Sequence, residues 1–304
     1  MDGPAGTQSG HRHGHDAATD AGRANNAAAD AADPVRIRRI ETWDEYQACV
    51  ALQNDVWGPE FAESVPAAIL MVSQRIGGVV AGAFDHDGQL IGFVFGMTGV
   101  EHGRLVHWSD MLAVRLSERG RGIGRRLKLF QRDAVRAVRV ETMYWTFDPL
   151  VARNARLNLI TLGADVVEYV PDMYGHATSS ALHQGLGTDR FIVAWRMGDG
   201  ARPEPRSEPR SELPAVACTG VPALNAMPAF PDGAPAVRVT VPLHIDRVQR
   251  QSLTVAASWR ADTRRAFLWC FAHGYHVTGY YRDEPTETAG YMLTRGAGPT
   301  IPPR

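Results

Sequence analysis

A glycine-rich turn between an extended run and an amphipathic helix constrains this chain most. The run 105–116 leads into a turn that contains Gly120, Gly122 and Gly124. A helix is predicted over 122–138, because apolar residues recur at positions 123, 127, 130, 134 and 138, the period of a helix that packs one face on a sheet. Glycines let a ligand approach the backbone, and the free N–H groups of a first helical turn favour negative charge. The sequence therefore predicts an anion-binding turn that suits a pyrophosphate.

Arginines surround the same turn. Arg119, Arg121, Arg125 and Arg126 add guanidinium groups, which bind phosphate oxygens in pairs. The dinucleotide fingerprint is absent, because the glycines run G-x-G-x-G and no acidic residue closes a strand about 20 residues later. No Gly-Lys-Ser/Thr follows either. The turn therefore belongs to neither a Rossmann domain nor a P-loop.

Strand and helix patterns alternate from Val35 to Met197. Thr42 with Glu45 forms a capping-box pattern at a helix start, and Asp87-Gly88 marks a hairpin turn. The predicted strands are 35–40, 79–85, 89–98, 105–116, 143–147, 165–170 and 190–195, and the predicted helices are 42–56, 122–138 and 152–162. This order predicts a mixed sheet with helices, an α/β layer architecture.

Composition divides the 304 residues into segments. Residues 1–34 have no large aliphatic side chain after Met1 and are expected to form a disordered leader. Residues 198–235 hold eight of the 19 prolines and are expected to form an extended linker. Residues 236–304 show a small β-α-β pattern, with strands at 237–245, 276–282 and 291–293 around a helix at 253–273. Because a unit of roughly 60 residues is marginal alone, we expect it to dock on the first domain, 35–197, or on a second subunit.

Charge and composition exclude several classes of protein. The 32 basic and 33 acidic side chains leave no basic excess, so neither a nucleic-acid partner nor a membrane surface is expected. No apolar stretch approaches the ~20 residues of a bilayer span and no signal region follows Met1, so we expect a cytoplasmic protein. The three cysteines are widely spaced without a C-x-x-C, and His11, His13 and His15 form an incidental tract, so no metal is expected.

The nine residues RGRGIGRRL, 119–127, resemble the R-x-x-G-x-G motif of the GNAT superfamily of acyl-CoA-dependent N-acetyltransferases. Arg119, Gly122 and Gly124 take the three defining places, and 111–114 looks like the family's fourth strand. The chain from Val35 to Arg295 is similar to a bacterial subgroup with a C-terminal extension. The resemblance implies a mixed, mostly antiparallel sheet flanked by helices, with acetyl-CoA as acyl donor and an amine as acceptor.

The resemblance also implies which groups would hold acetyl-CoA. Backbone groups of two strand residues would pair with the pantetheine arm, amides of the glycine turn would cradle the pyrophosphate, and a helix asparagine would hold the pantetheine or a water. These residues are Leu112, Val114, Arg119, Gly120, Arg121, Gly122, Ile123, Gly124, Arg125 and Asn154. A helix-start asparagine such as Asn154 can equally be a cap. Leu159 departs from the family, because it stands where a tyrosine commonly protonates the CoA thiolate, and leucine cannot donate a proton.

A general base must take a proton from the acceptor ammonium before or during its attack. His107 and Asp110 are the candidate catalytic residues. In an extended segment His107 and Ser109 share one face, and Trp108 and Asp110 share the other, so only one pair is expected to line the cleft. The sequence does not choose between them.

Two further groups of residues have ordinary structural explanations. Tyr169 and Tyr174 lie where the family's acceptor pocket is usually completed, but packing of a loop is the favoured interpretation. In the C-terminal helix, Arg260, Arg264 and Arg265 are expected to be the basic outer residues of an amphipathic docking helix.

The main functional hypothesis is an acetyl-CoA-dependent N-acetyltransferase that acts on an unidentified amine. Because the tyrosine acid is missing at Leu159, the alternative is a non-catalytic acyl-CoA-binding regulatory or assembly module that forms a homodimer through its C-terminal unit. A nucleotide-binding protein that uses the glycine turn for another phosphate ligand is the third hypothesis.

Overall fold

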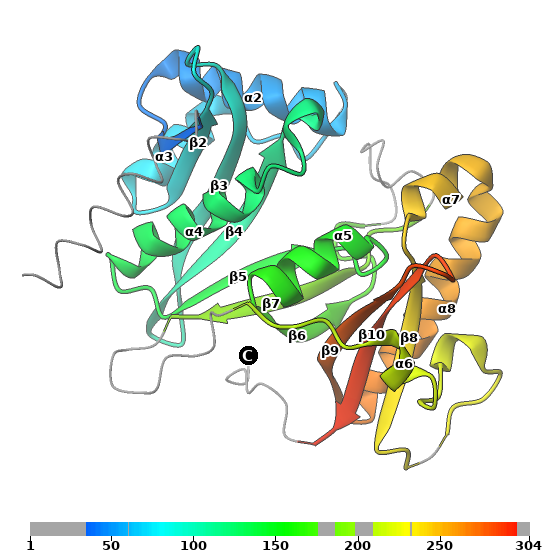
Figure 1. Ribbon diagram of the computed structural model, residues 1–304. Coiled ribbons are helices and arrows are strands. Elements are labelled where there is room, and N and C mark those ends of the chain that lie inside the picture. The colour runs from blue at the N-terminus through cyan, green and yellow to red at the C-terminus, as the bar shows by residue number, and fades with distance from the viewer. Residues whose placement is uncertain (1–34, 60, 176–185, 198–208, 232, 297–304) are drawn as a thin grey trace, which may run out of the picture.

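The computed structural model describes residues 35–59, 61–175, 186–197, 209–231 and 233–296. The predicted leader, 1–34, with its histidine tract, therefore lies outside the described residues. Figure 1 shows a large twisted sheet against which a smaller C-terminal sheet packs. Among the described residues, no helix combines the length and the apolar character that crossing a membrane requires.

The large sheet has seven strands in the order β1-β2-β3-β4-β5-β7-β6. Every neighbouring pair is antiparallel except β4 and β5, which are parallel. The strands are β1 (Arg36–Arg39), β2 (Val79–Phe84), β3 (Leu90–Glu101), β4 (Arg104–Val114), β5 (Thr142–Phe147), β6 (Asp165–Val170) and β7 (Arg190–Arg196). The predicted mixed, mostly antiparallel sheet is confirmed.

Helices cover both faces of this sheet (Figure 1). On one face lie α2 (Trp43–Trp57), which begins with the predicted Thr42–Glu45 capping box, and α3 (Ala67–Arg75), which the sequence patterns did not indicate. On the other face, α4 (Ile123–Arg136) places Ile123 and Leu127 in the core, because its apolar period matches one helical face. The helix after β5 consists of α5 (Ala152–Ala155) and a π-helical turn, η2 (Arg156–Thr161).

The sheet opens between β4 and β5. The two strands pair only where Val106–Trp108 faces Thr142–Tyr144, and beyond that point they separate. A β-bulge lies at the point of separation, since Phe95 of β3 pairs with Met111 while the next β3 residue pairs with Ser109. Asp110 is thus the extra residue of the bulge, and the open wedge begins beside it.

The C-terminal unit docks on the first domain. This is one of the two arrangements expected from the sequence, the other being docking on a second subunit. The sheet of the C-terminal unit, in the order β8-β10-β9, contains β8 (Ala236–Pro242), β9 (Tyr275–Asp283) and β10 (Thr288–Arg295), and its helices are α7 (Ile245–Gln251) and α8 (Leu253–Ala272). The hydroxyl of Tyr280 donates to Ala152 O at 3.0 Å, and that of Tyr291 donates to Pro149 O at 2.7 Å. The predicted first strand was too long, because β8 ends at Pro242 and Ile245 begins α7 instead.

Part of the predicted linker, 198–235, packs as structure. Its described residues include α6 (Ala215–Cys218) and a 3-10 turn, η3 (Leu224–Ala226). Cys218 and Leu224 are fully buried, and the Asn225 side chain exchanges hydrogen bonds with the backbone of Thr240 in β8. The prediction of an extended spacer is wrong for this part, because its apolar side chains cover the C-terminal sheet.

Candidate active site

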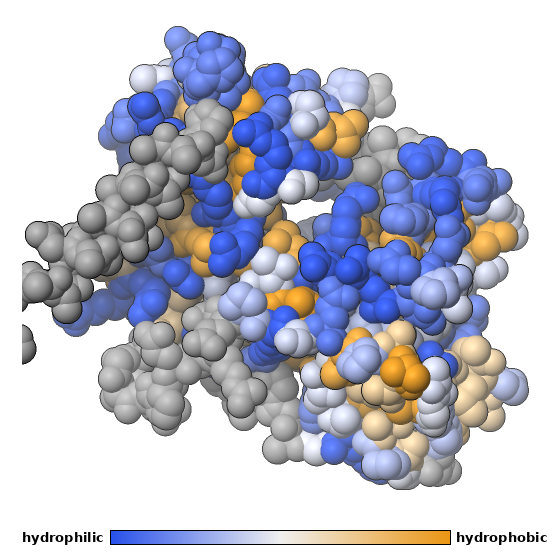
Figure 2. Space-filling view, viewed as in Figure 1, coloured by the Kyte–Doolittle hydropathy of each residue, from blue (hydrophilic) through white to orange (hydrophobic). Residues whose placement is uncertain are grey.

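A cavity of about 320 Å³ lies where β4 and β5 separate. Figure 2 shows the surface hollowed between the halves that carry α4 and α5, with mostly hydrophilic side chains around the opening. The lining comes from distant parts of the chain: 109–112 of β4, 145–147 of β5, 153–154 and 157–158 of the following helix, the α2–α3 loop and the start of α7. The C-terminal unit therefore contributes to the same cavity as the large sheet.

The glycine turn has the geometry that the sequence predicts for anion binding. Gly120 and Gly122 have φ angles of +85° and +76°, and Gly122 is the N-cap of α4 without any side-chain cap. A Cβ built on either glycine would meet no atom within 4 Å, so the backbone there faces open space. Because the first-turn amides of a helix have no intrahelical acceptor, the α4 N-terminus presents N–H groups to that space.

Two arginines, Arg119 after β4 and Arg153 of α5, are close enough for their charges to interact. Arg119 donates from Nε to Val114 O at 3.3 Å, and its pKa is lowered by burial and by the neighbouring charge of Arg153. Among the described residues, neither guanidinium pairs with a carboxylate, whereas Arg121 pairs with Glu118. Arg153, which lines the cavity, was missed from sequence because α5 is distant from the glycine turn along the chain.

The side chains of the other predicted turn residues, Ile123, Arg125 and Arg126, point in different directions. Ile123 buries its side chain in the core, so only its backbone can serve a ligand. Arg125 is exposed. Arg126 turns away from the wedge and donates to Val35 O at 2.8 Å, so it does not join the cationic cluster expected around the turn.

Backbone groups of β4 also point into the wedge. Arg115 N donates to Ile91 O at 2.9 Å, so odd-numbered residues from 111 to 115 direct their backbone polar groups toward β3. Because these groups alternate along a strand, those of Leu112 and Val114 point the other way, toward the side from which β5 has separated. The structure thus places both predicted backbone positions along the open wedge.

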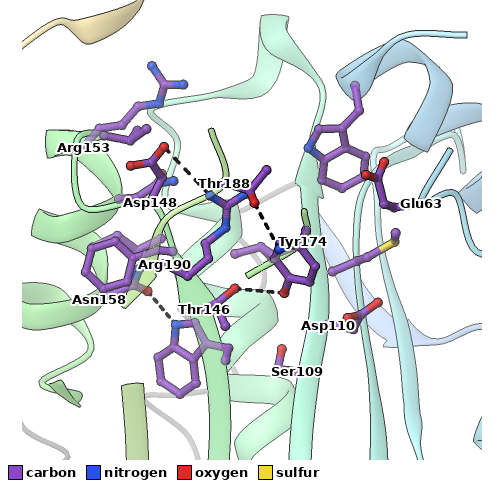
Figure 3. Close-up of a pocket in the computed structure, with 18 of the residues that line it drawn as sticks. Glu63, Ser109, Asp110, Thr146, Asp148, Arg153, Asn158, Tyr174, Thr188 and Arg190 are labelled. Carbon is purple, nitrogen blue, oxygen red and sulfur yellow. Dashed lines mark hydrogen bonds and ion pairs between the residues drawn. The ribbon is translucent and has the colours of Figure 1, made fainter. Parts of the chain in front are cut away.

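Asp110 lines the cavity together with Ser109. The predicted grouping of faces holds, because His107 and Ser109 both contact Gln131, while Asp110 has a side-chain hydrogen bond with Trp108. The expectation that only one pair lines the cleft is wrong, because Ser109 and Asp110 both border the cavity beside the bulge. The pKa of Asp110 is raised, because the surrounding protein desolvates its carboxylate. In Figure 3 Asp110 and Glu63 lie on the same side of the cavity.

His107 is not placed to act as a base. Its side chain is fully buried and lies outside the residues that line the cavity. Its Nδ1 is 3.0 Å from Thr98 Oγ1 and its Nε2 is 3.0 Å from Gln131 Nε2, so both nitrogens are occupied. Burial, with a contribution from the charge of Lys128, lowers its pKa to about 3. The structure contradicts this candidate, because the histidine is a neutral part of a buried network.

The helix after β5 supplies one wall. Asn154 lines the cavity, and so does Asn158, whose Oδ1 accepts from Trp145 Nε1 at 2.9 Å. Leu159 is buried, so this position offers no proton donor. The π-helical turn widens the helix at this wall, and such turns occur frequently at functional sites.

The segment after β6 forms the opposite wall. Tyr169 packs in the core as expected, but Tyr174 lines the cavity, where its hydroxyl is 3.2 Å from Thr146 Oγ1 (Figure 3). Its backbone amide donates to Thr188 Oγ1 at 3.0 Å, and burial raises the pKa of its phenol. The interpretation of Tyr174 as loop packing alone is therefore wrong. Arg190, whose guanidinium lies 5.2 Å from the Tyr174 ring centroid, was not found from sequence.

Arginines of α8 hold this wall in place. Arg260 is buried and donates to Asp148 Oδ2 at 2.5 Å and to Leu186 O at 2.8 Å. Arg264 donates to Asp172 Oδ1 at 2.8 Å and pairs with Asp189. The expectation of basic outer residues is wrong for Arg260 and Arg264, which turn inward toward carboxylates of the first domain, whereas Arg265 is exposed as expected.

No protein-family model matches this chain, and no curated protein sequence matches it. Solved structures match part of it. A putative acetyltransferase from Salmonella typhimurium with its cofactor acetyl-CoA is 18% identical, with 57% of this chain and 99% of that chain covered and a TM-score of 0.44. The ribosomal-protein-S18-alanine N-acetyltransferase from Escherichia coli is 17% identical, with 55% and 99% covered and a TM-score of 0.42. The NatC complex bound to Gag peptide and CoA is 12% identical, with 54% and 99% covered and a TM-score of 0.43. At these values the likeness assigns neither an activity nor a ligand to this chain.

Proposed function

We propose that this protein is an acetyl-CoA-dependent N-acetyltransferase of the GNAT type that acts on an amine. The observation that carries the proposal is the continuity between three features: the glycine turn, the open edge of β4 and the cavity beside Asp110. An acyl carrier with phosphates at one end, a long amide-containing arm and an acyl group at the other end matches these three features in that order.

The glycine turn would hold the pyrophosphate. Amides of residues 119–125 and the positive end of the α4 dipole favour its charge. Burial and, to a smaller extent, the charge of Arg153 lower the pKa of Arg119, so an anion bound beside the two guanidinium groups would offset both effects. The Arg121 guanidinium, held by Glu118, adds a further donor beside the turn.

The open edge of β4 would hold the pantetheine arm. Leu112 and Val114 direct backbone polar groups into the wedge, and an arm with two amide groups can pair with them as an added strand does. Asn154 reaches the same space from α5. The thioester would then lie near the bulge, where β4 amides can stabilise a developing oxyanion.

The acceptor would enter from the side of Tyr174 and the α2–α3 loop. Glu63, Asp110 and Asp246 bring carboxylates to the cavity, and Trp57 and Phe61 bring stacked rings with centroids 5.2 Å apart. Carboxylates and aromatic faces both favour a cation. The ammonium of an amine substrate would thus be attracted, and Asp110 is the carboxylate placed to accept its first proton.

The experiment that tests this function measures CoA release from acetyl-CoA in the presence of a panel of primary amines. Saturable, amine-dependent release that Asp110→Asn reduces supports the proposal. Binding of acetyl-CoA with no release across the panel favours the non-catalytic acyl-CoA-binding module instead, for which the absence of a tyrosine at Leu159 is the specific observation.

A further inference from the structure

Lys128 is the only lysine in the sequence, among 32 lysine and arginine residues. It lies on α4 with 3% of its surface exposed and lines the cavity. Its Nζ donates to Ser109 Oγ at 2.6 Å and lies 4.2 Å from the centroid of the Trp145 ring. Every other basic side chain that could carry a permanent charge is an arginine, so the one side-chain amine of the sequence is inside the candidate active site.

The surroundings of Lys128 favour the neutral amine. No carboxylate pairs with Lys128 among the described residues, and burial holds its pKa well below the ordinary value. An arginine at this place would stay charged, because a guanidinium does not lose its proton in proteins. A buried lysine therefore provides something that the 31 arginines cannot, which is a basic lone pair at neutral pH.

A chain of hydrogen bonds fixes the direction of each donor around this amine. The carbonyl of Gly77 can only accept, so the Thr98 hydroxyl donates to it at 2.7 Å. The neutral His107 then donates from Nδ1 to Thr98, and its Nε2 accepts from the Gln131 amide. The polarity of the first half of the chain is thus set by one backbone carbonyl.

The second half of the chain follows from the first. The NH₂ group of Gln131 donates to His107, so the Oε1 of Gln131 is the atom that accepts from the Ser109 hydroxyl, at 2.7 Å. Ser109 must therefore accept from Lys128, and its proton is not available to that amine. The serine is not activated as a nucleophile, and the lone pair of Lys128 points away from Ser109.

The position of Lys128 along α4 connects it with the proposed acyl carrier. It follows Gly124 by four residues, so both lie on the same face of the helix. A Cβ at Gly124 would lie 3.7 Å from Leu112 and 4.0 Å from Val114, so this face borders the open wedge. Lys128 lies one helical turn further along α4 than Gly124. Its Nζ contacts Ser109, which is next to the bulge at Asp110.

We propose that Lys128 is the proton shuttle of the transfer, carrying a proton from the acceptor nitrogen to the sulfur of CoA. The inference rests on the proposed N-acetyltransferase function. An ammonium loses two protons when it becomes an amide: the first passes to Asp110 and solvent before attack. As the C–N bond forms, the second passes to the lone pair of Lys128. As the C–S bond breaks, the Lys128 ammonium gives this proton to the leaving thiolate and becomes neutral again.

Other groups agree with this assignment. The face of Trp145 stabilises the transient Lys128 cation, and the shuttle supplies the proton that Leu159 cannot donate. Besides the buried His107, the ionisable side chains that share this cavity with Lys128 come from several elements: Glu63, Asp110, Asp148, Arg153, Tyr174, Arg190 and Asp246. Burial keeps His107 neutral, and Asp110 directly follows Ser109, to whose hydroxyl Lys128 donates.

The single lysine makes its charge state directly measurable. Protein labelled with ¹⁵N-lysine has one side-chain Nζ signal, which Lys128→Met abolishes. We expect the chemical shift of a neutral amine at pH 7.5. The shift of an ammonium that titrates near the ordinary value of about 10.4 would overturn the shuttle.

The kinetic test uses Lys128→Met, which keeps the length of the side chain, and Lys128→Arg, which keeps its charge. Both variants should bind acetyl-CoA with an affinity within about threefold of the wild type, while CoA release falls by about 100-fold or more. Wild-type rates in either variant overturn the shuttle but leave the N-acetyltransferase function standing. A gain of one acetyl mass at Lys128 would show that it is an acceptor and not a shuttle. A wild-type protein that binds no acetyl-CoA overturns the function and the shuttle together.

Discussion

The guanidinium of Arg260 in α8 donates to the carboxylate of Asp148, directly after β5, at a distance of 2.5 Å, and both side chains are 6% exposed. The pair joins residues 112 positions apart. It attaches the C-terminal unit to the strand that forms one side of the cavity. The Nε group of Arg260 also binds Leu186 O, next to the wall that carries Thr188. The C-terminal unit therefore supports the geometry of the candidate site.

Arg260→Met should destabilise the protein by about 3–5 kcal/mol, because Asp148 would remain buried without its main partner. Urea denaturation gives the free energy of unfolding. Arg265→Met, on the exposed side of the same helix, is the matched control and should cost about 1 kcal/mol or less. Equal losses in the two variants would contradict the structural role of the Arg260–Asp148 pair.

Asp110→Asn should reduce amine-dependent CoA release by about 100-fold, because an amide cannot accept the ammonium proton. The wild-type rate should rise with pH through the raised pKa of Asp110, since only the carboxylate is a base. In the variant this acidic limb should disappear. A variant that retains both the rate and the limb would show that another group is the base.

Asp110→Asn should stabilise the folded protein at neutral pH, although it reduces CoA release. The folded protein raises the pKa of Asp110, so it favours the protonated carboxyl, and ionisation costs stability above that pKa. Asp110→Asn should therefore melt at a higher temperature than the wild type at pH 7. The difference should vanish below the unfolded-state pKa of about 3.9, and its persistence there would mean that charge is not the cause.

His107 should make the protein sensitive to acid. The folded protein keeps the imidazole neutral with a pKa of about 3, whereas in the unfolded chain it gains a proton near pH 6.5. Its stabilising contribution is complete above that pH and is lost as the pH falls toward 3, at up to about 1.4 kcal/mol per pH unit. Unfolding measured at pH 6.5 and 4.5 should show a smaller loss for His107→Gln than for the wild type. Equal losses would place the acid sensitivity elsewhere.

Arg153→Gln should weaken acetyl-CoA binding by about tenfold, since a charge-assisted contact to phosphate contributes about 1.5 kcal/mol. The affinity for acetyl-pantetheine, which lacks the pyrophosphate, should not change. Arg75→Gln, at an exposed arginine at the end of α3 on the other face of the sheet, controls for the loss of one charge. An equal effect on both ligands would place Arg153 away from the phosphates.

Local signals in the sequence predicted much of the fold. The Thr42–Glu45 capping box, the Asp87-Gly88 turn and the apolar period of α4 each depend on residues within a few positions, and each is confirmed. The short helices α3 and α7 were missed, because nine and seven residues display too few turns for a clear period.

The site was predicted less completely, because its geometry depends on contacts between distant segments. The choice between His107 and Asp110 required the register of β3 on β4, which places the bulge at Asp110. The roles of Arg153 and Tyr174 required the packing of their segments around the wedge. In sequence, Lys128 is simply one charge on a basic helix, and only its packing beneath Trp145 shows that it is buried.

Calorimetric titration with acetyl-CoA shows whether the glycine turn before α4 binds the acyl donor. Gly88→Glu is a matched control for Gly122→Glu, because both glycines have a φ angle of +76° and open space around a Cβ, but Gly88 lies in the β2–β3 hairpin. We expect saturable one-to-one binding by the wild type and by Gly88→Glu, and loss of binding in Gly122→Glu. Absence of binding by the wild type, or equal binding by both variants, would contradict the assignment of the glycine turn to acetyl-CoA.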